Sequence, residues 1–426
     1  MIGMSRMMKY ALLLFCISIS FIASAKKIVL PQNFENGKNV LRQSMLTVPG
    51  AEYVLCYKYD LLGDTITMPK GASLSFNSDA SISNGFFKGN NSNVKADVAF
   101  VRFYGIQFSG DWNVRHIYST WFNMNEDTEA NTSNFRSMCM LTGDNHKGTI
   151  HIARGNYTVK ADKKYPSVMV LNSNTELILD GTIILEGNEL ERYNIIDINS
   201  KRNIVVHGLG IIMGDVATHI GDKGQWGMGI SVQTSDNVDI TDIKIKNCWG
   251  DCIYVGQSIR ERGNICRNVR IQNVVCESGR RQGLSIIAGK DILVKNCEFI
   301  KIGSIKFTAP GAGIDIEPNH PQTIMENIII DGCSFGENIK GKDLAIINLD
   351  KTASIKIRNC CFDHKLVFWD NSYNIEVENC VINILDINKA ENIIIKNSSF
   401  KKNISPRVRK QIKVLKNCSF PKEKIQ

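Results

Sequence analysis

Short segments of alternating aliphatic and polar residues recur along the second half of the chain. Eight of them between Val238 and Phe420 end in a small or polar pair that is most often Asn-Cys. A period of two is typical of strands, and a repeat of about 20 residues is too short for a pair of helices. Each unit therefore predicts one coil of a parallel β-helix, stacked on the next at the roughly 4.8 Å spacing of paired strands. The second residue of the pair falls at Cys248, Cys276, Cys297, Cys333, Cys360, Cys380, Ser398 and Cys418.

The start of the chain has a different pattern. Arg6 and Lys9 precede an apolar stretch of about a dozen residues, and an Ala-Ser-Ala sequence ends at Ala25. This pattern predicts a secretory signal peptide over residues 1–25, and no later segment is apolar enough to span a membrane. We expect a secreted or periplasmic protein.

The rest of the chain is predicted to be all-β. Residues 26–120 read as a β-rich N-terminal region, because short alternating segments are broken by turn sequences such as Pro-Lys-Gly and Asn-Gly. Residues 121–426 are predicted as the β-helix domain, which begins with a short capping helix around 134–141. A solenoid of this length is feasible because each coil contacts only its neighbours.

Charge and cysteine content limit the classes of function that this chain can have. The chain carries 51 basic and 42 acidic residues, and nine of the basic ones lie in residues 401–426. We expect this basic tail to protect an exposed end of the solenoid from strand pairing, and we expect no nucleic-acid binding, since no basic stripe follows the body. The cysteines share a repeat position and lack zinc spacing, so we expect them to be mostly free and buried. We expect a monomer.

Three consecutive coils stand out by their polar residues. They read WGDCIYVG from Trp249, RRQGLSIIAG from Arg280 and GAGIDIEPNH from Gly311, and the coil before them contains QWGMGISV. In order and spacing these coils resemble the catalytic coils of glycoside hydrolase family 28 polygalacturonases, and the segment GTIHIARGNY resembles the entry to the pectate-lyase-like superfamily. This resemblance implies a right-handed, single-stranded parallel β-helix.

The catalytic residues of that family are replaced in this sequence. Its first aspartate corresponds to Met228 and the first of its paired aspartates to Gly250, while its histidine corresponds to Gln282. The arginine and lysine that hold an acidic sugar correspond to Asp315 and Glu317. Polygalacturonase chemistry is therefore not expected here.

The replacement residues offer a different chemistry. Ile314 and Ile316 should face the core, so Asp315 and Glu317 should project from one outer face about 6.5–7 Å apart. That separation suits an inverting glycosidase, and the proximity of two carboxylates would raise the pKa of one of them. We predict Asp315, Glu317 and Asp251 as catalytic residues. Carboxylates at alternate positions are also common on the solvated face of a sheet, which remains the alternative.

Several neighbours are predicted to bind the substrate. They share a place in these coils or in the turn and loop beside them, and they are Gln282, Arg281, Arg280, Trp249, Tyr254, Asn319, His320 and His219. The aromatic cluster from Phe368 to Asp370 is a candidate for a further sugar subsite, since aromatic rings stack on sugars. Each has a plainer alternative: the arginines could neutralise the acidic cluster and the aromatic residues could pack in the core.

Three functions remain open from the sequence. The leading hypothesis is an exported glycoside hydrolase that acts on a polysaccharide without a cofactor. The second is a lyase or epimerase in which Asp251, Asp315 and Glu317 hold Ca²⁺ and Arg280 or Arg281 acts as the base. The third is a β-helix that binds glycans without catalysis, because one fold can carry all three activities.

Overall fold

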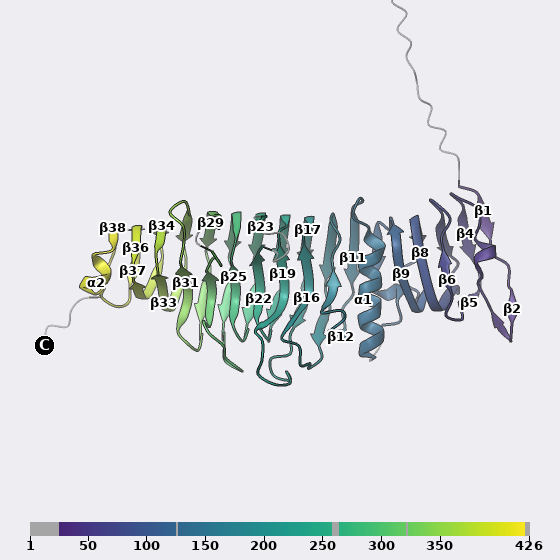
Figure 1. Cartoon of the computed structure of the whole chain (residues 1–426), viewed down its shortest axis with the longest axis horizontal. Coiled ribbons are helices and arrows are strands. Elements are labelled where there is room, and N and C mark those ends of the chain that lie inside the picture. The colour runs from purple at the N-terminus through teal and green to yellow at the C-terminus, as the bar shows by residue number, and fades with distance from the viewer. Residues whose placement is uncertain (1–24, 125–126, 258–263, 321–322, 422–426) are drawn as a thin grey trace, which may run out of the picture.

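The chain forms a long parallel β-helix in a computed structural model that describes residues 25–124, 127–257, 264–320 and 323–421 (Figure 1). Among these residues, each coil contributes one strand to a twelve-stranded sheet along one side of the solenoid. Its pairings are all parallel, and its strands are β10 (His116–Tyr118), β11 (Gly148–Ile152), β14 (Thr175–Leu179), β17 (Arg202–His207), β20 (Asp236–Thr241), β23 (Cys266–Gln272), β26 (Gly289–Lys295), β29 (Met325–Asp331), β32 (Ile355–Arg358), β34 (Ser372–Glu378), β36 (Ala390–Lys396) and β38 (Ile412–Lys416).

A second, bent sheet forms the two other sides. One side consists of β12 (Asn156–Val159), β15 (Thr182–Leu185), β18 (Ile211–Met213), β21 (Lys244–Lys246), β24 (Val275–Glu277), β27 (Glu298–Ile300), β30 (Ser334–Gly336) and β37 (Ser399–Phe400). The other, here called the site side, consists of β13 (Ser167–Val170), β16 (Arg192–Asn199), β19 (Trp226–Gln233), β22 (Asp251–Gly256), β25 (Gln282–Ile286), β28 (Ala312–Ile316) and β31 (Lys342–Ile347). The longer strands β33 (Cys361–Trp369) and β35 (Val381–Ile387) run through both sides.

Inward side chains fill the solenoid in columns, because parallel strands in register place equivalent residues one above another. Phe299, Phe335 and Phe362 form one such column, and their successive ring centroids lie 5.5 and 5.0 Å apart. Ile314 and Ile316 are fully buried, as the alternation in their strand predicted. The parallel β-helix inferred from the repeat is confirmed.

The turn that follows each strand of the twelve-stranded sheet explains the asparagine of the repeat. In eight successive coils the first residue after the strand has a φ between 50° and 66°, a left-handed conformation that Asn, Asp and Gly adopt more readily than other residues. The side chains also bond from coil to coil, and Asn273 Nδ2 donates to Asp242 Oδ1 at 2.8 Å. The eight residues are Asp242, Asn273, Asn296, Gly332, Asn359, Asn379, Asn397 and Asn417.

This register corrects two positions of the predicted repeat. Cys276 pairs with Ile245 and Phe299, so it belongs to a different column from Cys297. Cys248 follows β21, whereas Cys297 precedes β27, so these two cysteines are not equivalent either. In those two coils the left-handed residues Asp242 and Asn273 are followed by Ile243 and Val274 rather than by Cys. The Asn-Cys pattern therefore predicted the wrong residues as equivalent. All twelve cysteines in the described part of the chain are free, and nine are buried.

The N-terminal region is also built from parallel strands. Among the described residues, β1 (Lys27–Val29), β4 (Glu52–Leu55), β5 (Lys58–Asp60), β6 (Thr65–Thr67), β7 (Ser73–Phe76), β8 (Ser81–Lys95) and β9 (Phe103–Trp112) form a seven-stranded sheet. A short antiparallel pair, β2 (Phe34–Glu35) and β3 (Lys38–Asn39), lies beside it. The predicted signal peptide lies outside the described residues, apart from Ala25.

The predicted helix is present as α1 (Thr128–Thr142). Asp127 precedes it and accepts a hydrogen bond from the backbone N–H of Ala130, which satisfies one free donor of the first turn. The helix packs against β9, β12 and β13 and lies between β9 and β11 within the stack of coils (Figure 1). Its role as a cap stays a prediction, since strands continue on both sides of it.

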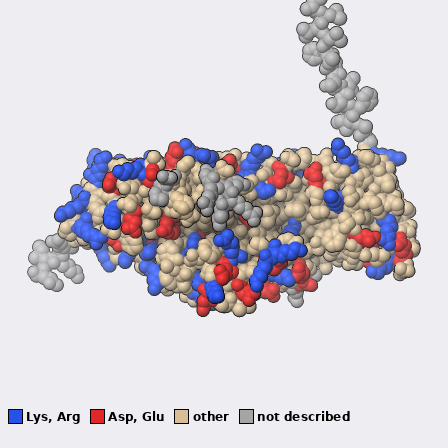
Figure 2. All heavy atoms as spheres, in the orientation of Figure 1, with Lys and Arg blue, Asp and Glu red and all other residues tan. Residues whose placement is uncertain are grey.

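The C-terminal end carries a second, short helix, α2 (Pro406–Arg409), before the last strand β38. Lys and Arg side chains crowd this end on the face that Figure 2 shows, whereas both signs of charge mix along the rest. In the described ranges, no helix has the length and apolar character needed to cross a membrane.

Candidate functional site

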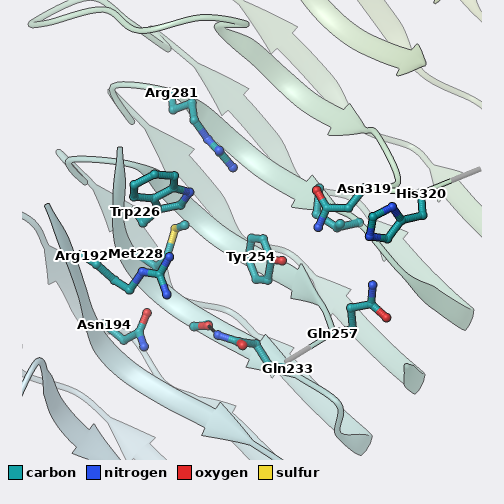
Figure 3. Close-up of a pocket in the computed structure, with 12 residues that line it drawn as sticks. Arg192, Asn194, Trp226, Met228, Gln233, Tyr254, Gln257, Arg281, Asn319 and His320 are labelled. Atoms are coloured by element: carbon teal, nitrogen blue, oxygen red, sulfur yellow. Dashed lines mark hydrogen bonds between the residues drawn. The ribbon is translucent and has the colours of Figure 1, made fainter. Parts of the chain in front are cut away.

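A cavity of about 380 Å³ opens on the outward face of the site side, over β16, β19 and β22. Tyr254 lies in its middle, with Trp226 and Met228 on one side and Asn319 and His320 on the other (Figure 3). Tyr254 is half-buried, and Trp226 is 36% exposed. Two aromatic rings are therefore available to a ligand in the cavity.

The remaining lining is polar. Asn194, Gln233 and Gln257 supply amide groups that can both donate and accept hydrogen bonds. Arg192 lies with its guanidinium 5.2 Å from the centre of the Trp226 ring, and Arg281 lines the cavity at the edge that faces β28. Aromatic surfaces beside convergent hydrogen-bonding groups are typical of sites for small polar ligands such as sugars.

The strand register aligns the cavity with the predicted carboxylates. Ser231, Tyr254, Ser285 and Asp315 are successive neighbours across β19, β22, β25 and β28, so they form one outward column. At the strand spacing, Asp315 lies about 10 Å beyond Tyr254. Asp251 and Gln282 pair directly in a second outward column. Asp251 thus lies two strands, and Gln282 one strand, from the strand of Asp315, as the sequence predicted.

Asp315 is the most perturbed carboxyl group on this face. It is only 3% exposed; its Oδ2 accepts a hydrogen bond from Gln282 Nε2 at 2.9 Å, and its Oδ1 has no partner in the described part of the chain. Burial raises the pKa of Asp315 to about 8, and the negative charge of Glu317 adds to the rise. A pKa in this range keeps Asp315 protonated at neutral pH, and its Oδ1 is a buried oxygen without a partner.

Gln282 holds this group in place through both ends of its amide. Gln282 is fully buried, and its Oε1 accepts a hydrogen bond from the backbone N–H of Ala312 at 2.8 Å. That bond fixes the direction of Nε2 toward Asp315. Gln282 is thus a positioning residue, and Glu317 follows directly after β28 as a half-buried group.

Asp251 has a different environment from Asp315. It is completely buried and accepts hydrogen bonds from Arg281 Nε at 2.7 Å, Arg281 Nη2 at 2.6 Å and Ser285 Oγ at 2.8 Å. Burial disfavours the charge of Arg281, but the Asp251 carboxylate outweighs this effect and raises the pKa of Arg281. Asp251 is therefore engaged in an ion pair that keeps Arg281 charged, which is the arrangement of a structural pair, and its catalytic role stays a prediction.

Three predicted substrate-binding residues lie in a buried stack outside the cavity lining. The Trp249 ring is fully buried, with the His219 ring centroid 3.6 Å from its own and the Arg280 guanidinium 3.7 Å from its centre. Arg280 also donates hydrogen bonds to the carbonyl oxygens of Asp222 and Gly224, and His219 Nδ1 lies 2.7 Å from Asp215 Oδ2. We therefore assign these residues to the support of the loop that precedes Trp226, because none of them lines the cavity.

Of the other predicted binding residues, Tyr254, Arg281, Asn319 and His320 line the cavity. The sequence-based prediction did not include Arg192 and Asn194, because β16 lies before Val238, where the repeat begins. Trp226 and Met228 belong to the coil before the three that stand out by their polar residues, and in that coil the resemblance marks only the position of the lost aspartate. Alternation within QWGMGISV places Trp226 and Met228 on the same face, and that signal could have identified them.

The calcium alternative finds little geometric support. Both oxygens of Asp251 already accept hydrogen bonds from Arg281 or Ser285. Over residues 25–124, 127–257, 264–320 and 323–421, no group of three or more His, Cys, Asp or Glu side chains is placed to hold a metal ion.

Comparison with known proteins gives distant relatives. No protein-family model matches the chain. The SPbeta prophage-derived uncharacterized protein YorA of Bacillus subtilis (strain 168) is 24% identical over 265 residues, which cover 55% of this chain and 44% of YorA. The uncharacterized protein YclG of the same organism is 26% identical over 216 residues, which cover 46% of this chain and 37% of YclG. The matches thus span less than half the length of both curated relatives.

A solved structure with a similar fold is the tailspike protein gp49 of Acinetobacter baumannii bacteriophage Fri1, a capsular polysaccharide depolymerase. It matches with a TM-score of 0.50 and 13% sequence identity, and the match covers 73% of this chain and 64% of the tailspike chain. At this identity the likeness concerns the fold alone. With the stacked coils described above, it confirms the parallel β-helix that the resemblance to the pectate-lyase-like superfamily implied.

Proposed function

We propose that the protein is an exported carbohydrate-active enzyme that hydrolyses a polysaccharide on the site side of its β-helix. The observation that carries this proposal is the carboxyl group of Asp315, whose pKa is raised to about 8, next to Glu317 and in line with the cavity. The polysaccharide depolymerase activity named for the similar tailspike is in keeping with it. Export rests on the signal peptide predicted from the sequence.

The two carboxyl groups have complementary roles in this proposal. Asp315 acts as the general acid and gives its proton to the glycosidic oxygen as the bond from that oxygen to the anomeric carbon breaks. Glu317 acts as the general base and takes a proton from the water that attacks the anomeric carbon. Alternate positions on a strand separate them by about 6.5–7 Å, which leaves room for that water and predicts inversion at the anomeric carbon.

The cavity groups hold the sugar on one side of that bond. Tyr254 and Trp226 offer flat surfaces to a sugar ring, and the amides of Asn194 and Gln233 offer partners to its hydroxyl groups. Arg281 remains charged and is fixed by Asp251, so it can donate a hydrogen bond without a large loss of side-chain entropy.

A second candidate function is binding of a polysaccharide without cleavage. It is favoured by the burial of Asp315, which is 3% exposed and does not line the cavity. In that case Asp315 would only stabilise the outward face through Gln282.

The test compares cleavage and binding in the same variants. Purified protein is incubated with a panel of bacterial capsular, algal and plant polysaccharides; reducing ends report hydrolysis, and absorbance at 235 nm reports unsaturated lyase products. Hydrolysis by the wild type that is lost in Asp315→Asn and in Glu317→Gln, with polymer binding retained, supports the proposal. Hydrolysis that persists in both variants overturns the assignment of these residues, and binding without any cleavage supports the second candidate.

A further inference from the structure

The outward face of the site side becomes apolar beyond Asp315. Ala345 and Val367 continue the column of Asp315 on β31 and β33, and both are fully buried although they point away from the core. Ala312 belongs to the same small cluster. Outward positions of a β-helix are normally solvated, so a buried outward cluster needs a cover.

Part of that cover comes from Trp369, at the end of β33. Trp369 and Ile347 pack against the cluster, and the two residues pair with each other across β33 and β31. Lys342 Nζ lies 4.9 Å from the centre of the Trp369 ring. We call Ala312, Ala345, Val367, Ile347 and Trp369 the apolar shelf. The indole of Trp369 packs against the buried residues of the apolar shelf and lies beside Lys342, yet it remains partly exposed.

The apolar shelf and the cavity lie on opposite sides of the two carboxyl groups. The cavity lies mainly over β16, β19 and β22, with Asn319 and His320 at its rim, whereas Trp369 lies on β33, past β28. Ile316 pairs with Ile346 and Ile346 with Phe368, so the residues that follow them, Glu317, Ile347 and Trp369, stand at the same level on three neighbouring strands. Two strand spacings place Trp369 about 10 Å from Glu317.

We propose that Trp369 is the platform of a second sugar subsite, which binds the part of the polymer on the other side of the cleaved bond. This inference rests on the function proposed above. A pyranose ring presents an apolar face of C–H groups, which fits a flat indole that is already immobilised, and its hydroxyl groups can accept hydrogen bonds from Lys342 Nζ.

The two subsites define how the polymer lies on the solenoid. With one subsite in the cavity and another on the apolar shelf, the polymer lies along the solenoid and continues past the carboxyl groups in both directions. The enzyme then cuts internal bonds of a polysaccharide, and sugars that cannot reach Trp369 are poor substrates.

The test uses three substitutions of Trp369 on the wild-type background. Trp369→Ala removes the ring, Trp369→Leu removes the ring but keeps an apolar cover on the shelf, and Trp369→Phe keeps a flat ring. We expect Trp369→Leu and Trp369→Ala to raise the KM or the Kd for the polymer roughly tenfold, which is the change that about 1.4 kcal/mol produces. Trp369→Phe should recover most of the loss, and the melting temperature of Trp369→Leu should stay near that of the wild type.

A matched control exists one coil away on another side of the solenoid. Tyr373, on β34, has Lys351 Nζ 5.6 Å from its ring centre, which is the same kind of pair as Lys342 and Trp369. Tyr373→Leu should leave the KM and Kd unchanged.

The outcomes separate the two proposals. If the wild type binds or cleaves a polymer and Trp369→Leu behaves like Tyr373→Leu, the second subsite is wrong while the proposed function stands. If the wild type neither binds nor cleaves any polymer of the panel, both proposals are overturned. Release of single sugars from chain ends, in place of internal cuts, would also contradict the subsite.

Discussion

Replacement of Asp315 by Asn should make the protein more resistant to alkaline conditions. The amide has the shape of the carboxyl group, its oxygen can still accept the hydrogen bond from Gln282, and it cannot ionise. In the wild type, burial and Glu317 raise the pKa of Asp315 from 3.8 to about 8. Ionisation of this group in the folded protein is therefore unfavourable, and Asp315→Asn removes that cost.

Proton linkage gives the sign and size of the effect of pH on the free energy of unfolding. Because the pKa is raised in the folded state, the group's contribution to stability is fully present below pH 3.8 and is lost as the pH rises through about 8. Between these limits the unfolded chain has released the proton that the folded chain keeps, so the free energy of unfolding of the wild type falls by about 1.4 kcal/mol per pH unit. Between pH 3.8 and about pH 8, the free energy of unfolding of Asp315→Asn should therefore gain about 6 kcal/mol on that of the wild type.

The assay is urea unfolding of both proteins at pH 5, 7 and 9, followed by circular dichroism. Asp386→Asn is the control for loss of a carboxylate, because Asp386 pairs with Val367 and so lies in the outward column that contains Asp315. We expect the advantage of Asp315→Asn to increase from pH 5 to about pH 8 and then to level off, so that it is larger at pH 7 than at pH 5 and larger again at pH 9. An advantage that is the same at all three pH values would refute the argument that the fold keeps Asp315 protonated.

Three further predictions concern other parts of the site and its support. Arg281→Met leaves the buried Asp251 without its ion-pair partner and should lower the free energy of unfolding by about 3–5 kcal/mol, whereas the double variant with Asp251→Asn should recover most of it in urea titrations. Trp249→Ala empties the stack between His219 and Arg280 and should cost about 3–5 kcal/mol, measured by the unfolding midpoint; unchanged stability would contradict its role as support. If the protein is a hydrolase, its rate should fall as the pH rises through about 8, because Asp315 then loses the proton it donates, and a rate that keeps rising to pH 10 would exclude Asp315 as the acid.

The solenoid could be predicted because its signal is local and repeated. Alternating Ile and Val residues with a polar turn define each coil without knowledge of distant contacts, and the inward burial of Ile314 and Ile316 follows from the same alternation. The exact register was harder to obtain. Cys248 and Cys276 resemble their counterparts in sequence, but in their coils the left-handed residue that follows the strand of the twelve-stranded sheet is Asp242 or Asn273.

The candidate site was predicted only in part, because exposure depends on loops. Alignment of the coils by their strands correctly placed Asp251 two strands and Gln282 one strand from Asp315. Alternation alone would have turned Asp251 and Gln282 inward, because each lies two residues before a core side chain. It could not show that Arg281 would turn back onto Asp251. Nor could it show that the loop before Trp226 would cover Trp249, since that contact joins coils through segments without regular structure.

The continuous stacking of coils also limits how such a protein can change in evolution. Each coil depends on the coil before and the coil after it, so gain or loss of a whole coil beyond β33 would leave the outward columns from β16 to β33 intact. An insertion between β25 and β28 would instead separate Gln282 from Asp315 by one strand spacing and break their hydrogen bond. Length variation among descendants of this protein should therefore concentrate at the C-terminal end, where coils can be added or lost without disturbing the carboxyl groups.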